Sequence, residues 1–244
     1  TLTYTQRNLF RGAESFFLKF RGAYEAIRQL EGYRNQNYTE YGVEATLRFP
    51  TLPVSPGERH LRTYKGSTDF SLMYNSQNRP EFYRRLLTAT WSVDWNRHAQ
   101  PNLRHHLDIA SLNYVFMPWI SDTFRRTYLE GDNPRYAVLR YSYENLFIMR
   151  SAYSFVYNSL RTPGMGNLYR TNGYQIRAGI ETAGNLLYGI SKMLRMHQNA
   201  DGSYAIFSIP YSQYVKFDVD FSKSVRLSET NSLAWHAAFG IAIP

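Results

Sequence analysis

Residues 215–222 read Val-Lys-Phe-Asp-Val-Asp-Phe-Ser, so apolar and polar side chains alternate without a break. Successive side chains of a β-strand point to opposite faces, and this spacing therefore predicts a strand with one apolar and one polar face. Residues 233–242 (Leu-Ala-Trp-His-Ala-Ala-Phe-Gly-Ile-Ala) and 87–96 (Leu-Thr-Ala-Thr-Trp-Ser-Val-Asp-Trp-Asn) show the same apolar set at every second position. This repetition predicts an all-β protein built from antiparallel strands.

The period-2 pattern recurs along the whole chain of 244 residues. It is clear at 16–24, 41–49 and 174–181, and weaker at 2–8, 69–75, 107–116 and 150–158. We therefore expect about ten strands, each placed to within about two to four residues. Many of these runs extend over about 10–15 residues, whereas strands of soluble proteins usually have about 5–6. Strand length thus favours an antiparallel transmembrane β-barrel, whose strands must cross a bilayer.

The connections carry turn residues and two helical patterns. Gly-Asp-Asn-Pro at 131–134 and Pro-Gly-Met-Gly at 163–166 predict turns in long loops. Apolar residues at helical spacing in 186–194 predict a short helix, and 119–130 predicts another helical turn or two. Because no linker separates these elements, we expect residues 1–244 to form part of a single barrel domain.

Composition excludes several other classes of protein. The chain has no cysteine, so it has no disulfide framework and no thiolate metal site. The net charge is +9, but the basic residues are scattered and form no block of the kind that binds nucleic acid. No run approaches the roughly 18 apolar residues of a membrane helix. The chain opens and closes on strand-like patterns, so we expect it to be the N-terminal part of a longer barrel.

Alternation alone does not decide which face is buried, because a soluble sandwich or a lipocalin shows the same period. Three features favour an outward apolar face: long strands, a heavily charged polar face, and aromatic residues near strand ends, as in membrane girdles. On this interpretation, nine charged residues face the lumen: Lys19, Arg21, Glu44, Arg48, Arg177, Glu181, Lys216, Asp218 and Asp220.

Candidate chemical groups have simpler structural interpretations. His98, His105 and His106 are close in sequence, but no carboxylate spacing completes a metal or catalytic site, so we expect a solvated turn. Adjacent histidines on a strand would in any case point to opposite faces. The pair Asp218 and Asp220 is typical of a charged lumen wall rather than of an acid–base pair. We therefore expect no enzyme activity, no cofactor and no bound metal.

Several segments resemble the barrel of the Omp85 superfamily, and in particular the BamA/TamA-like proteins and related surface antigens of Bacteroidota. They occur in the expected order at 4–14 (Tyr-Thr-Gln-Arg-Asn-Leu-Phe-Arg-Gly-Ala-Glu), 153–158 (Tyr-Ser-Phe-Val-Tyr-Asn), 181–187 (Glu-Thr-Ala-Gly-Asn-Leu-Leu), 212–218 (Ser-Gln-Tyr-Val-Lys-Phe-Asp) and 239–244 (Phe-Gly-Ile-Ala-Ile-Pro). The individual motifs are short, and their order is the stronger indication.

The resemblance implies a 16-stranded barrel of the Gram-negative outer membrane, of which about ten strands fall in this sequence. It implies a factor for protein insertion or protein transport that acts through a lateral seam at its first strand. The partners would be outer-membrane lipid, an unfolded outer-membrane protein or other secreted client, and accessory lipoproteins of an assembly complex. The chain shows neither the POTRA-like domains nor the inward-folded loop motif of this group. The seam strand would be Leu2, Thr3, Tyr4, Thr5, Gln6, Arg7 and Asn8.

Two alternatives of other classes remain open. Arg21, Arg48 and Arg177 could line a passive outer-membrane channel or uptake barrel and bias it toward anions. A barrel enzyme would need a catalytic set at the rim, and the sequence contains no nucleophile-elbow motif.

Overall fold

The computed structural model describes residues 1–27, 37–52, 63–130, 136, 140, 142–159, 172–184, 205–206, 209–210 and 213–243. The protein is all-β, with ten antiparallel strands in one sheet. Long runs of alternating aromatic, β-branched and polar residues favour this extended structure. The strands of the sheet are β1 (Leu2–Arg7), β2 (Ser15–Glu25), β3 (Tyr38–Phe49), β4 (Tyr64–Asn78), β5 (Phe82–Arg97), β6 (Gln100–Ile120), β7 (Leu146–Asn158), β8 (Gly173–Ala183), β11 (Tyr214–Arg226) and β12 (Ser232–Ile243).

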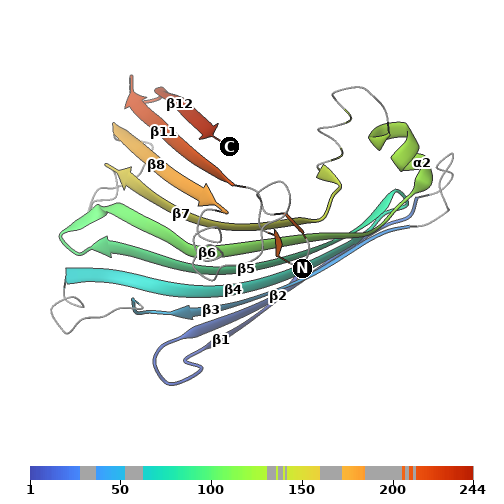
Figure 1. Ribbon diagram of the computed structural model, residues 1–244. Helices are drawn as coiled ribbons and strands as arrows, with labels where there is room; N and C mark the ends of the chain where they lie inside the picture. Colours follow the sequence, from blue (N-terminus) through green and yellow to red (C-terminus); the bar gives the residue numbers. More distant parts are fainter. Residues whose placement is uncertain are drawn as a thin grey trace.

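The sheet is a meander in which each strand pairs with the next one along the chain, in the order β1-β2-β3-β4-β5-β6-β7-β8-β11-β12. A separate two-stranded pair, β9 (Ala205–Ile206) and β10 (Ile209–Pro210), lies in the connection between β8 and β11. Figure 1 shows the sheet curving across its width into a trough, with β1 and β12 as its two edges. This fold is compatible with a β-barrel.

Strand lengths confirm the expectation of long strands. β4 has 15 residues, β5 has 16 and β6 has 21. Nine of the ten strands extend beyond the predicted segment at one or both ends, because pairing continues past the residues that alternate cleanly. The predicted helical turn in 119–130 is also present, as α2 (Asp122–Phe124) followed by a π-helical turn, Arg125–Leu129.

A bulge in β6 explains why its alternation looked weak in the sequence. On β5, Trp91 and Ser92 pair with Ala110 and Asp108, so Ile109 is an extra residue on β6. The Ser151 hydroxyl donates a hydrogen bond to the Ile109 carbonyl oxygen at 2.7 Å. One extra residue reverses the faces of the strand beyond it, and the polar side chains change from even to odd numbers there.

The structure corrects one prediction and leaves others untested. His105 and His106 lie inside β6 rather than in a solvated turn, and the turn between β5 and β6 contains His98 instead. The predicted helix at 186–194 and the predicted turns at 131–134 and 163–166 lie outside the described residues. None of the helices in the described part of the chain is long and apolar enough to cross a membrane.

Candidate functional site

The sheet has one face that carries all of its acidic residues. The register links every Asp and Glu of the ten strands to the same side, from β2 through β11. We call this side the charged face. Its carboxylates are Glu25, Glu40, Glu44, Asp69, Asp94, Asp108, Glu181, Asp218 and Asp220.

All nine residues that the sequence assigned to a lumen lie on the charged face. Arg21 pairs with Glu44 at 3.2 Å between the guanidinium nitrogen and the carboxylate oxygen. Lys216 and Asp218 approach to 3.9 Å. Lys19 lies opposite Glu44 on the neighbouring strand, and Arg177 lies opposite Asp220. The remaining pairs are Arg48 with Asp69 (2.6 Å) and Arg150 with Glu181 (2.8 Å).

A connected polar network crosses the middle of this face from β5 to β11. Arg150 donates to Glu181 and approaches Asp108, and these two carboxylates have side chains only 17% and 11% exposed. The Tyr214 hydroxyl donates to the other Glu181 oxygen at 2.5 Å. On the far side, His106 contacts both Asp94 and Asp108 at 3.2 and 3.1 Å.

Sequence reasoning missed most of this network, although Glu181 was among the predicted residues. The polar residues Arg104, His106 and Asp108 have even numbers, whereas the polar residues Ser111 and Asn113 have odd numbers. This change from even to odd positions within one strand was the sequence signal for a bulge. Once the bulge is placed, Asp108 falls between His106 and Arg150 on one face.

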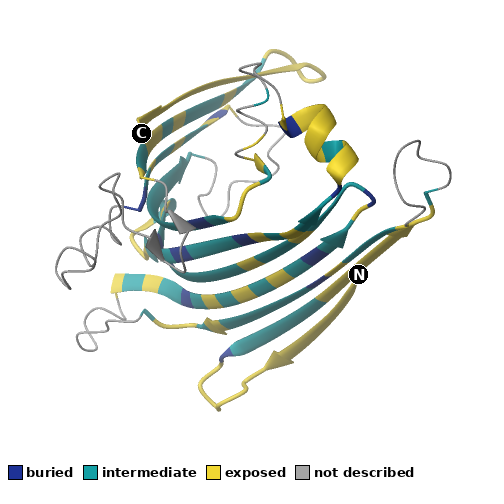
Figure 2. Ribbon diagram, turned by 45° about the vertical axis from the view of Figure 1, so that its right-hand side comes forward, coloured by how far each residue is buried: buried dark blue, intermediate teal, exposed yellow. Residues whose placement is uncertain are grey.

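The charged face is the concave one. Phe82 shares this face with Arg84, and its ring lies 6.2 Å from the ring of Phe124 in α2. Figures 1 and 2 both show α2 over the concave side of the sheet. Tyr143 completes this cluster at 5.2 Å from Phe82. The charged side chains therefore point into the trough.

The opposite, apolar face is exposed and contains no carboxylate on any strand of the sheet. Its large side chains are well exposed, for example Leu72 at 53%, Val219 at 48% and Phe239 at 69%. A soluble monomer rarely exposes so wide an apolar surface. The only lysine and arginine residues that the register places on this face are Arg85, Arg97 and Lys223, all within four residues of a strand end.

Aromatic side chains on the apolar face gather toward both ends of the strands. One belt contains stacked, tilted or edge-to-face ring pairs at 5.0–6.3 Å: Phe49–Phe70–Trp91, Trp95–His105–Tyr153 and Tyr157–Tyr174–Phe221–Trp235. At the other end lie the pairs Tyr41–Tyr74, Tyr83–Trp119 and Tyr114–Phe147. His105 stacks on Trp95 in the first belt, while His106 belongs to the charged network, so the adjacent histidines do lie on opposite faces.

The predicted seam strand, β1, is one of the two edges of the described sheet. β1 pairs with β2 through six residues, and all six residues of β1 are exposed (Figure 2). β12 pairs with β11 through twelve. β1 covers only Ser15–Phe20 of β2, so the second half of β2 has no neighbour in the described sheet on that side.

A hydrogen-bonded loop follows β1 at its C-terminal end. Asn8, which the sequence placed in the strand, instead begins this loop with φ 60°, and Ala13 also has a positive φ of 64°. The buried Glu14 carboxylate accepts hydrogen bonds from the amides of Phe10 and Gly12 at 3.2 and 3.0 Å. Hydrogen bonds from its own amide, and then from these two, hold the pKa of Glu14 below its ordinary value.

The described residues contain no group of three or more His, Cys, Asp or Glu side chains that could hold a metal ion. No protein-family model, curated protein or solved structure matches the chain.

Proposed function

We propose that the chain is part of a β-barrel of the Gram-negative outer membrane, with the apolar face against lipid and the charged face toward the lumen. The observation that supports this most strongly is the segregation of all nine strand carboxylates to the concave face. Lipid-facing positions of such barrels are apolar, and cations are tolerated there only near the interfaces. Arg85, Arg97 and Lys223 have that position.

The spacing of the aromatic belts fits a bilayer. On β5, Tyr83 and Trp95 belong to opposite belts and are twelve residues apart. At about 3.4 Å per residue they are separated by about 40 Å along the strand. A strand tilt of about 40° reduces this to about 30 Å along the membrane normal, close to the thickness of a hydrocarbon core.

Within this barrel, we propose that β1 serves as a template for strands of a client protein during insertion or transport. An edge strand offers unpaired amide and carbonyl groups to which another strand can add. β1 is exposed and is an edge of the described sheet, so its outer backbone groups are available to another strand. The client is then an unfolded outer-membrane protein or another secreted chain.

The charged face favours this role over that of an anion channel. Arg21 and Arg48 were the arginines expected to attract anions, and both are neutralised by carboxylates at 3.2 and 2.6 Å. Only Arg177 of the three makes no ion pair with any described residue. Paired charges give a weaker field than the unpaired rings that select ions.

Site-specific photocrosslinking in cells tests the template role. A photoreactive phenylalanine analogue at Tyr4 lies on the edge strand, and the same analogue at Phe70 lies on the same face in the middle of the sheet. We expect client proteins to crosslink at Tyr4 and not at Phe70. Equal client crosslinking at both positions, or none at Tyr4, contradicts the template role. A steady anion-selective conductance in planar bilayers would favour the channel instead.

A further inference from the structure

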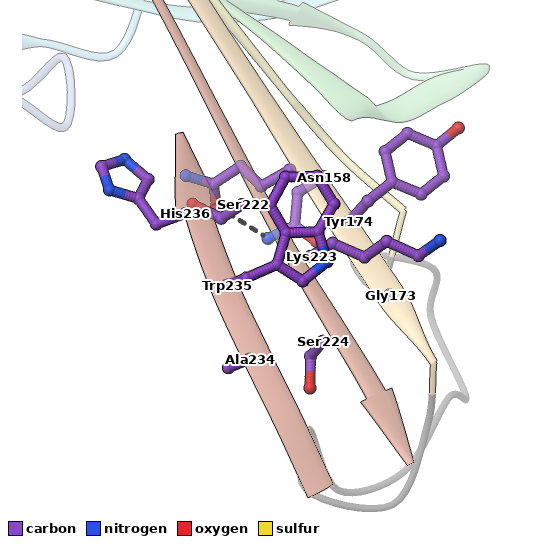
Figure 3. Close-up of a pocket in the computed structure, with 10 residues that line it drawn as sticks. Asn158, Gly173, Tyr174, Ser222, Lys223, Ser224, Ala234, Trp235 and His236 are labelled. Atoms are coloured by element: carbon purple, nitrogen blue, oxygen red, sulfur yellow. Dashed lines mark hydrogen bonds between the residues drawn. The ribbon is translucent and has the colours of Figure 1, made fainter. Parts of the chain in front are cut away.

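Lys223 is the only charged side chain in the middle of the aromatic belt on β8, β11 and β12. The register places it directly opposite Tyr174 on β8 and Trp235 on β12. Figure 3 shows Lys223 and Tyr174 extending to one side of the strands, while His236 extends to the other. Lys223 therefore lies between two aromatic residues on the apolar face.

No acidic group on this face balances the charge of Lys223. The nearest carboxylate along its own strand, Asp220, is on the charged face, where it pairs with His236. The apolar face of the described strands has no Asp or Glu, and Lys223 itself forms no ion pair with a described residue. A cation in this position needs an anion from outside the sheet.

Apolar side chains on the same face of β11 flank this position. Next to it, Phe221 contacts both aromatic rings, at 6.3 Å from Tyr174 and 5.0 Å from Trp235. Farther along the same face of β11 the side chains are Val219 and Phe217, both exposed. The site thus joins one cation to an exposed apolar surface, as the headgroup and acyl chain of an anionic lipid require.

We propose that Lys223, Tyr174 and Trp235 bind the phosphate group of an anionic glycerophospholipid, whose acyl chain lies along Phe221 and Val219. This inference rests on the proposed membrane-embedded sheet. Lysine binds phosphate as a point charge, and interfacial tyrosine and tryptophan place their polar atoms at headgroup depth. One lysine matches the single charge of a phosphodiester, whereas the two phosphates of lipid A would need more cations than this one position provides.

The test uses the complete protein in nanodiscs of phosphatidylcholine with a minor fraction of spin-labelled phosphatidylglycerol. The fraction of immobilised label gives the relative association constant. Lys223→Met keeps the aliphatic length and removes the charge. Lys216→Met is the matched control, since it removes a lysine from the same strand on the charged face. Spin-labelled lipid A and phosphatidylcholine form the other arms.

We expect the wild type and Lys216→Met to prefer phosphatidylglycerol over phosphatidylcholine. Lys223→Met should lose about fivefold in this preference, which corresponds to about 1 kcal/mol for one lysine at a membrane surface. An unchanged preference in Lys223→Met overturns the site, and stronger retention of lipid A overturns the stated lipid. A protein that does not enter nanodiscs at all refutes the membrane proposal itself, so the two failures are distinguishable.

Discussion

A lysine placed at Val219 should destabilise the protein far more than a lysine placed at Val225. Both valines lie on the apolar face of β11, but Val219 is in the middle of the strand and Val225 is one residue from its end. The two substitutions are chemically identical and differ in depth alone.

The expected change in the free energy of unfolding is small if water surrounds Val219 and large if lipid does. Val219 is 48% exposed in the isolated sheet, so in water a lysine there would remain solvated and change the unfolding free energy by about 0.5 kcal/mol or less. In a bilayer, a lysine near the midplane of a barrel strand costs about 2–4 kcal/mol, and one near the interface about 0–1 kcal/mol. We therefore expect Val219→Lys to cost at least 1 kcal/mol more than Val225→Lys.

The assay is reversible urea unfolding of the complete protein in lipid vesicles, followed by the fluorescence of its tryptophans. Four tryptophans lie in this chain, and three of them, Trp91, Trp95 and Trp235, belong to one aromatic belt. Equal, small effects of the two substitutions would refute the assignment of the apolar face to lipid. The same pair measured in detergent micelles checks that the difference depends on depth.

Other substitutions test the network and the loop. Arg150→Met leaves the Asp108 and Glu181 carboxylates without their shared cation. We expect the free energy of unfolding to fall by about 1–3 kcal/mol, between the values for exposed and buried ion pairs. A double-mutant cycle with Glu181→Gln that shows no coupling would contradict the network. In Gly12→Ala, the new Cβ would lie 2.1 Å from a Glu14 carboxylate oxygen, so we expect about 1–2 kcal/mol of destabilisation. Ala13→Gly should instead stabilise the protein by about 0.5–1 kcal/mol, because it relieves a positive φ. Reversed signs in urea unfolding would show that the loop is not held as described. Because the pKa of Glu14 is lowered by folding, its contribution is present above the ordinary glutamate pKa and is lost as pH falls below about 4, and Glu14→Gln should remove this part of the pH dependence of stability.

The strands were predictable wherever apolar and polar side chains alternate along the sequence. β11 and β12 follow this pattern over nearly their full length, so their predicted and observed bounds agree within a few residues. β6 was underestimated because Ile109 reverses the pattern, and a period-2 search cannot continue through an extra residue.

The charged face was predictable as a set of residues, but its pairings were not. Alternation placed Arg48 and Glu181 on the polar side of their strands, and the register now supplies their partners, Asp69 and Arg150. Those partners depend on how neighbouring strands align, which one sequence does not specify. The direction of curvature was equally inaccessible, because alternation is the same for either direction; the position of α2 over the charged face now identifies the concave side.

The central claim is that lipid covers the apolar face and water covers the charged face, and a cysteine scan of β11 tests it most directly. The chain has no native cysteine, so a spin label at each of residues 215–222 reports one position only. In nanodiscs of the complete protein, we expect labels at odd positions to collide with oxygen in the lipid phase and labels at even positions with a water-soluble nickel complex. Nickel access at the odd positions, or no alternation at all, would contradict the account.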